Sequence, residues 1–318
     1  MNEHWTWLAP LCICLISLGV AGMARAAESV LPDGEATEPQ QLATGFQFTE
    51  GPLWLPGQEL LIFSDIPADT IYSGDSEVVR QPSGQSNGLT LDLEGRLITC
   101  EHANRRVTRT EADGSITVLA AQYEGNRLNS PNDVIVRSDG MIFFTDPPYG
   151  LPGMLDGPHA ELDFSGVYAV MPGEDVQLLV DDFDKPNGLT LSPDESVLYI
   201  ADTDGGHLRA FDVATDGSLS NDRHFYDLPT PDGIKTDTEG RIWATAGDGV
   251  HVISPEGERI TIIAFPEVPA NLCFGGSDGG VLYVTARNSV YAVDTTVEGI
   301  RPQAEAVFPL SGTTSELE

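Results

Sequence analysis

Short apolar runs separated by polar turns fill the chain from about residue 42 to about residue 293. This part keeps no 3.6-residue apolar period long enough for a helix. The runs follow one repeated order, which the second unit shows: a strand pattern at 87–91, a Glu-Gly turn at 94–95, and strand patterns at 96–100, 105–109 and 116–119. Turns of this composition join antiparallel strands. The pattern therefore predicts a four-stranded antiparallel meander.

The meander occurs six times, and a polar residue opens the first strand of each copy. These anchor residues stand 37 to 55 residues apart, and they are Glu50, Asn87, Asn132, Asn187, Asp232 and Asn271. A strand-bearing repeat of this length indicates a solenoid, propeller or array. Radial repetition of such meanders gives a β-propeller. We therefore predict an all-β fold, a six-bladed β-propeller of four-stranded antiparallel blades.

Two segments outside the regular repeat have expected roles in this fold. The strand at Leu42–Phe48 precedes the first anchor, so we expect it to join the last blade and close the ring. The interval between Asn132 and Asn187 is the longest of the five, and its excess is a Pro- and Gly-rich segment from Pro147 to Phe164. A loop of this length is typical of a lid.

The N-terminal segment resembles an export signal. Leu8 to Met23 is an apolar run that ends in Ala-Arg-Ala at 24–26, a small-x-small cleavage site, although no Lys or Arg precedes it. We expect a cleaved signal peptide at 1–26, a flexible leader at 27–40, one propeller domain at 41–310 and a flexible tail at 311–318. The mature protein is then periplasmic or secreted, with no stable membrane association after signal cleavage.

Net charge limits the possible partners. The 318 residues carry a formal charge of −33, which repels nucleic acid and anionic membranes. We expect a small-molecule substrate and a monomer or weak homo-oligomer. Two cysteines remain after signal removal, Cys100 and Cys273, and both lie in apolar strand patterns. An exported protein can pair such cysteines, but their separation favours two buried free thiols.

The anchors suggest a metal site. The first strand of each propeller blade lines the central channel, so six anchors form a ring of two carboxylates and four amides. Hard oxygen donors favour Ca²⁺, then Mg²⁺ or Mn²⁺, over Zn²⁺. The alternative explanation is that Asn-Gly and Asp-Gly simply form turns, but this does not account for Glu50. We expect Glu50 and Asp232 to be ligands, followed by Asn187 and Asn132.

Several motifs resemble those of the senescence marker protein/gluconolactonase/luciferin-regenerating-enzyme family, especially its bacterial gluconolactonase branch. They are Thr49–Trp54, Cys100–Arg106, Ser130–Asp133, Thr145–Gly150, Pro186–Leu189 and Pro231–Gly233. The resemblance implies a divalent-metal lactonase acting on sugar lactones. By motif position, Glu50, Asn187 and Asp232 are the metal ligands, Asp232 is also the acid/base, and Asn132 contacts substrate. The chain departs from animal members at Ser130, where they have a substrate-binding Arg.

The proton-transfer group has two candidates in the sequence. Asp232 is the first, although a carboxylate bound to a cation is a weaker base. His102 follows a second strand that returns to the anchor end, so it is the rival. Asn87 and Tyr149 are further substrate-binding candidates. Two other functions remain open: a non-catalytic propeller with a structural Ca²⁺ that binds a partner or a sugar, and an arylesterase or organophosphate hydrolase.

Overall fold

The computed structural model describes residues 38–310. The expected signal peptide (1–26), most of the expected leader (27–40) and the expected tail (311–318) lie outside the described residues. Two short 3-10 turns, η1 (Pro56–Gln58) and η2 (Met154–Asp156), are the helical elements of the described part. No helix within residues 38–310 has the length and apolar character needed to cross a membrane.

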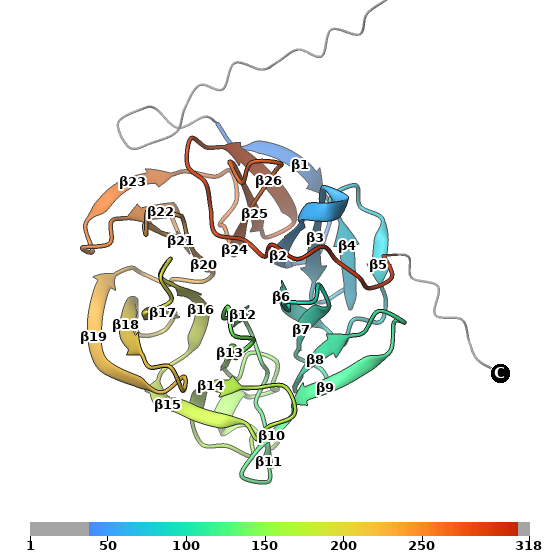
Figure 1. The fold of residues 1–318 in the computed structure, drawn as a ribbon, viewed down its shortest axis with the longest axis vertical. Coiled ribbons are helices and arrows are strands. Elements are labelled where there is room, and N and C mark those ends of the chain that lie inside the picture. Colours follow the sequence, from blue (N-terminus) through green and yellow to red (C-terminus); the bar gives the residue numbers. More distant parts are fainter. Residues whose placement is uncertain (1–37, 311–318) are drawn as a thin grey trace, which may run out of the picture.

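Six four-stranded antiparallel sheets stand around a central channel and form six blades, as predicted (Figure 1). Blades one to three contain β2 (Thr49–Leu55), β3 (Leu60–Asp65), β4 (Thr70–Ser73) and β5 (Val78–Arg80); β6 (Ser86–Leu91), β7 (Leu97–Glu101), β8 (Arg106–Thr110) and β9 (Ile116–Ala120); and β12 (Val134–Val136), β13 (Ile142–Asp146), β14 (Ser165–Val170) and β15 (Gln177–Phe183). A small hairpin of β10 (Gln122–Tyr123) and β11 (Asn126–Arg127) precedes blade three.

The remaining three blades follow the same order from the channel outward. They contain β16 (Pro186–Leu191), β17 (Val197–Asp202), β18 (His207–Val213) and β19 (Leu219–Asp227); β20 (Ile234–Thr236), β21 (Ile242–Ala246), β22 (Gly249–Ile253) and β23 (Arg259–Ile263); and β24 (Asn271–Gly275), β25 (Val281–Ala286), β26 (Ser289–Asp294) and β1 (Gln40–Thr44).

The ring closes through the first strand, which pairs antiparallel with β26 of the last blade. The predicted closure is confirmed, but the strand lies earlier than the predicted Leu42–Phe48. It begins at Gln40, inside the expected leader, and ends at Thr44. Gly45 follows with a φ of 101°, a backbone conformation that glycine adopts readily, and it turns the chain toward β2.

Side chains of neighbouring blades pack together and form the core. The cluster between blades one and two joins Leu53 and Ile62 to Leu89 and Leu97, all buried. Successive side chains of a strand point to opposite faces of the sheet, so each blade can pack against both of its neighbours. Burying one Leu or Ile side chain stabilises the fold by about 1.5–3 kcal/mol. Each blade is therefore stabilised by the next one around the ring.

The segment from Pro147 to Phe164, predicted to be a lid, is attached to blade two and to the loop that enters blade three. The backbone N–H of Gly150 donates to Ser130 Oγ (2.8 Å). Arg105 donates to the carbonyl of His159 (2.8 Å), while the His159 side chain is exposed. The segment therefore lies over the end of the propeller at which the anchors stand.

Candidate active site

The six anchor residues stand at or just before the start of the inner strands, and five of them are at least 97% buried. Asp232 is partly exposed. Hydrogen bonds join several of the neighbouring anchor segments. They include the N–H of Gly88 to the carbonyl of Asn132 (2.8 Å) and the N–H of Gly188 to the carbonyl of Asp232 (3.0 Å). The predicted convergence of the anchors at one end of the channel is confirmed.

The glycines that follow two anchors allow this close approach. A Cβ on Gly88 would lie 2.6 Å from the carbonyl oxygen of Asn132, and one on Gly188 would lie 2.4 Å from that of Asp232. Neither glycine has a positive φ, and both lie inside inner strands. The Asn-Gly turn explanation is therefore wrong here. The small residue is needed where adjacent blades meet at the channel.

Four oxygen atoms of the ring are buried and have no hydrogen-bond partner within the described part of the chain. They are Oδ1 of Asn87, Asn132, Asn187 and Asp232. The Asn187 nitrogen is used instead, since it donates to Thr203 Oγ1 (3.1 Å). Leaving a buried acceptor without a donor costs about 1–3 kcal/mol. The ring therefore presents oxygen atoms suited to a cation or to donor groups of a ligand.

The two ring carboxylates repel each other. Burial raises the pKa of Glu50 to about 7, with Asp133 adding to the rise, while the Gly51 N–H, the Asn271 amide and Lys235 oppose it. Burial and the negative charge of Glu50 raise the pKa of Asp232 well above its ordinary value. A divalent cation between them would relieve this repulsion.

The donor set fits a hard divalent cation. Residues 38–310 contain no group of three or more His, Cys, Asp or Glu side chains arranged for a metal. A site at the ring must therefore combine the carboxylates of Glu50 and Asp232 with amide oxygens. Ca²⁺ commonly accepts this mixture, whereas Zn²⁺ sites use mainly His and Cys ligands.

His102 lies beside the ring, with Nε2 3.4 Å from Nδ2 of Asn87. Its side chain is buried, and burial lowers its pKa to about 4. The imidazole is therefore neutral near pH 7 and forms part of the wall next to Asn87. The structure brings this predicted residue to the ring end of the channel.

Tyr149 reaches the site from the lid. Its hydroxyl is buried and has no hydrogen-bond partner in the described residues, and burial raises its pKa. The Lys185 ammonium lies 5.6 Å from the centre of the Tyr149 ring and also pairs with Asp204 (2.6 Å). Lys185 precedes Asn187 by two residues, so these contacts connect the lid to blade four.

Asp146 and Asp202 support the loops that precede two anchors. Asp146 accepts the N–H of Asn129 (2.7 Å), and Asp202 accepts the N–H groups of Asp184 and Lys185 (3.0 and 2.9 Å). Each carboxylate ends the second strand of its blade and holds the loop that leads to an anchor. Asp65 holds residues 47 and 48 in the same way.

Three residues near the ring have supporting roles that the sequence did not predict. Asn271 holds Glu50, Thr203 holds Asn187, and Arg287 contributes positive charge near Asp232. The carbonyl of Arg287 also accepts the N–H of Thr49 (2.7 Å), next to Glu50. Asn271 was identifiable from its anchor position, but nothing in the local sequence points to Thr203 or Arg287.

The cysteines are free and buried, as favoured by the sequence. Cys100 lies in the cluster between blades two and three, and Cys273 packs beside Trp54 and Phe63 between blades six and one. Neither belongs to the ring. They are separate core thiols without a role in the site.

Fold and ring together define a six-bladed β-propeller with a buried oxygen-lined site at one end of its channel. Residues 48–288 match the family described as the SMP-30/gluconolactonase/LRE-like region, and the chain belongs to this family.

Individual relatives agree with that assignment. The gluconolactonase of Zymomonas mobilis subsp. mobilis is 29% identical over 297 aligned residues, covering 83% of each protein. Bos taurus regucalcin is 28% identical over 281 aligned residues, covering 83% of this chain and 90% of regucalcin. The solved structure of a gluconolactonase from Xanthomonas campestris has a TM-score of 0.74 and 33% identity, covering 83% of this chain and 99% of that one.

Proposed function

We propose that this protein hydrolyses a sugar lactone, such as glucono-1,5-lactone or a related aldonolactone, at the ring of anchor residues. Family membership and the gluconolactonases among its relatives support lactone hydrolysis. The proposal includes a divalent cation, with Ca²⁺ as the first candidate, bound by Glu50, Asn187 and Asp232. When bound, such a cation polarises a lactone carbonyl and lowers the pKa of a nearby water.

The four unpartnered oxygens are the observation that carries this proposal. Oδ1 of Asn187 and Oδ1 of Asp232 supply cation ligands alongside Glu50. Oδ1 of Asn132 and Oδ1 of Asn87 are left to accept hydrogen bonds from sugar hydroxyls. The hydroxyl groups of a sugar ring can donate hydrogen bonds to these amide oxygens, whereas an aryl ester carries no such donors. The arrangement therefore favours a sugar over an aromatic substrate.

Asp232 is the proposed proton-transfer group. Its carboxylate is the less buried of the two in the ring, so the attacking water can reach it. It takes a proton from the attacking water as oxygen adds to the lactone carbonyl. It then returns a proton to the ring oxygen as the C–O bond breaks, so lactone and water give the open hydroxy acid. His102 is a weaker candidate because its pKa of about 4 leaves it a poor proton acceptor.

Tyr149 and the lid orient the substrate and limit access of water. The buried Tyr149 hydroxyl lies close enough to Thr203 and Asn187 to interact with them. It is therefore placed to contact a sugar hydroxyl beside Asn187. The bond between Gly150 and Ser130 fixes the adjoining part of the lid at 2.8 Å.

An assay of lactone hydrolysis tests the proposal. Purified protein is treated exhaustively with EDTA, and acid release from glucono-1,5-lactone is followed with a pH indicator before and after addition of Ca²⁺, Mg²⁺, Mn²⁺ or Zn²⁺. Activity should disappear on chelation and return with a divalent cation. Full activity after chelation would contradict the metal-dependent mechanism. Stabilisation by Ca²⁺ without turnover of any lactone would instead favour a binding protein.

We also propose that the protein is exported, on the basis of the apolar run from Leu8 to Met23 and the following Ala-Arg-Ala sequence. Expression of the full chain in a bacterium, followed by fractionation and N-terminal sequencing, tests this. A mature protein that begins at Ala27 in the periplasm or medium is expected. A cytoplasmic protein that retains residues 1–26 would contradict export.

A further inference from the structure

A second cavity, of about 500 Å³, lies in the channel away from the ring. Most of its lining residues lie on or just after the inner strands that carry the anchors, two to eight positions further along the chain, as in Leu53 of β2, Leu89 of β6 and Val134 of β12. Cavities of this size commonly hold small organic ligands. The ring residues do not line it, so the cavity is a different site from the proposed lactone site.

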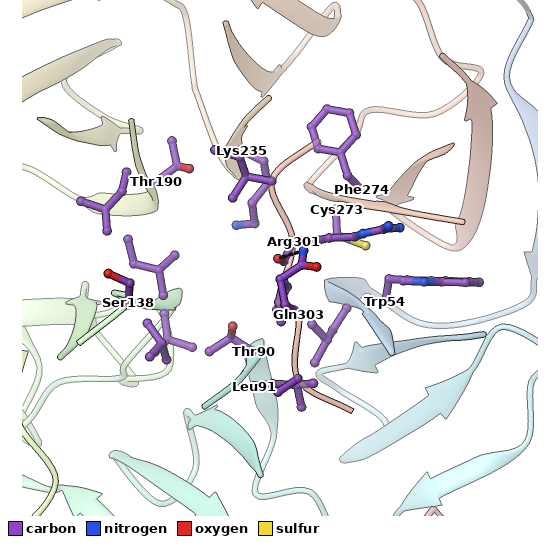
Figure 2. A pocket seen from close by; sticks show the side chains of 18 of the residues that line it. Trp54, Thr90, Leu91, Ser138, Thr190, Lys235, Cys273, Phe274, Arg301 and Gln303 are labelled. Atoms are coloured by element: carbon purple, nitrogen blue, oxygen red, sulfur yellow. Dashed lines mark hydrogen bonds between the residues drawn. The ribbon is translucent and has the colours of Figure 1, made fainter. Parts of the chain in front are cut away.

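We call this space in the channel the lower cavity. Its walls are mainly apolar. Leu53, Leu89, Leu91 and Leu191 contribute aliphatic surface, and Trp54 and Phe274 contribute aromatic surface (Figure 2). Apolar walls solvate water poorly, so an apolar ligand body that displaces water from them gains free energy.

One cationic side chain of an inner strand projects into this apolar space. Lys235 belongs to β20, and Figure 2 shows its ammonium group pointing toward the middle of the cavity. An ammonium carries three donors. The acceptor that the structure provides is Oδ2 of Asp133 at 3.4 Å, a long contact. The remaining donors are available to an anionic group in the cavity.

Because the other charged groups around the cavity have partners, Lys235 is the group inside the cavity that can bind an anion. Asp92 is paired with Arg96 (2.6 Å), and Glu195 accepts the N–H of Ser138 (2.8 Å), so both lining carboxylates are engaged. Arg301 adds a second positive charge at the mouth, where it donates to the carbonyl of Gly276. Of the two cations that line the cavity, Lys235 therefore faces the interior, while the Arg301 guanidinium is held at the mouth by the carbonyls of Gly276 and Ser277.

A strap, defined as residues 300–304, crosses the mouth of the cavity. It is tied down on both sides: the N–H of Ile300 donates to the carbonyl of Thr236 (3.0 Å), and the N–H of Val307 donates to the carbonyl of Gly95 (2.9 Å). Arg301 and Gln303 lie over the cavity between these ties (Figure 2). The strap separates the apolar interior from solvent.

We propose that this lower cavity binds a small amphipathic carboxylate. The carboxylate accepts hydrogen bonds from the Lys235 ammonium, and the apolar body lies against the leucine and aromatic walls beneath the strap. Charge complementarity selects an anion over a neutral amphiphile, and the limited volume selects a small ligand over a peptide. The proposal concerns a second site and does not depend on the proposed lactonase activity.

Calorimetric titration of the full-length protein with decanoate, and with decan-1-ol as the uncharged comparison, tests the proposal. Decanoate should bind with one site per chain and at least tenfold more tightly than decan-1-ol. Lys235→Met, which keeps an unbranched side chain of similar length and removes the charge, should weaken decanoate binding at least tenfold and leave decan-1-ol binding unchanged. Lys235→Arg, which keeps the charge, should retain most of the affinity.

A cavity-filling variant provides a second test that remains valid if the Lys235 variants misfold. Thr90 lines the cavity from β6. Thr90→Trp should abolish binding of both compounds while thermal unfolding remains cooperative. The proposal is overturned if wild-type protein binds neither compound. It is also overturned if Lys235→Met binds decanoate as tightly as wild type, or if decanoate competes with the lactone for the ring.

Discussion

The side-chain amide of Asn271 donates a 3.0 Å hydrogen bond to Oε2 of Glu50 across the junction between the last and first blades. The same oxygen accepts the N–H of Gly51 (2.8 Å). These bonds fix the orientation of the carboxylate within the ring. Asn271→Ala should therefore weaken Ca²⁺ binding by about 10–100-fold, the usual effect of removing a residue that orients a metal ligand.

Calorimetric Ca²⁺ titration measures this effect, and Asn104→Ala is the matched control. Asn104 also donates to a buried glutamate, Glu101 (2.6 Å), but that glutamate pairs with Arg80 of blade one and Arg106 of blade two. Asn104→Ala should leave Ca²⁺ affinity unchanged. Equal effects of the two variants would show a general loss of stability and contradict a specific role for Asn271.

Asp232→Asn separates catalysis from folding. Loss of the proton-transfer group should lower kcat by about 10²–10⁴-fold. The same change removes a carboxylate whose pKa is raised by desolvation and by Glu50, so the metal-free variant should melt at a higher temperature than wild type at pH 8. Steady-state kinetics and thermal melts in EDTA check both statements. A variant with reduced kcat and reduced metal-free stability would contradict this account.

The metal-free protein should lose stability as the pH rises. The pKa of Glu50 is about 7 in the folded state and 4.5 ordinarily, so the folded protein holds more protons than the unfolded chain between these values. The free energy of unfolding therefore falls across that interval. Melting temperatures at pH 5 and pH 8 in EDTA measure the fall, which Glu50→Gln should reduce and excess Ca²⁺ should offset. An equal fall in Glu50→Gln would assign it to other groups.

Gly88→Ala should destabilise the contact between blades two and three. Its Cβ would meet the carbonyl of Asn132 at 2.6 Å, and overpacking of this kind costs about 1–3 kcal/mol. Gly247→Ala is the control, because its Cβ would meet Thr230 at an ordinary 3.5 Å. Urea denaturation compares the free energies of unfolding. Equal stability of the two variants would mean that the close approach does not require glycine.

His102→Gln should reduce kcat by less than about tenfold, since its low pKa makes it a poor base. The pH-rate profile of wild type should lack a limb near 6.5, the ordinary pKa of histidine. Kinetics between pH 5 and 9 test this. A loss comparable to that of Asp232→Asn, together with a changed pH profile, would make His102 the proton-transfer group.

The six-bladed fold was predictable because the anchors repeat in register with the strand patterns. Glu50 was informative because a turn does not require it, and the structure places it in the ring with Asp232. The local sequence could not show that Asn271 holds Glu50, since 221 residues separate them. That contact exists only after the ring has closed.

The roles of the glycines and of the lower channel needed the structure. Asn-Gly is a common turn sequence, so the local sequence suggests a turn at Gly88. In the structure, Gly88 is needed because the carbonyl of Asn132 in the next blade approaches it closely. The lower cavity depends on the strap at 300–304, whose sequence has no strand pattern and gives no sign that it crosses the channel. Contacts between distant segments decide both features.

The pairing of β1 with β26 has a consequence for biosynthesis. The strand that completes the last blade is made among the first, more than 200 residues before its partner. During translation, β1 has no strand to pair with until β26 has been made. Pairing of strands over such a sequence separation is slow. The ring therefore cannot finish folding until nearly the whole chain has been synthesised. Until the last blade is released, β1 therefore remains without its β26 partner.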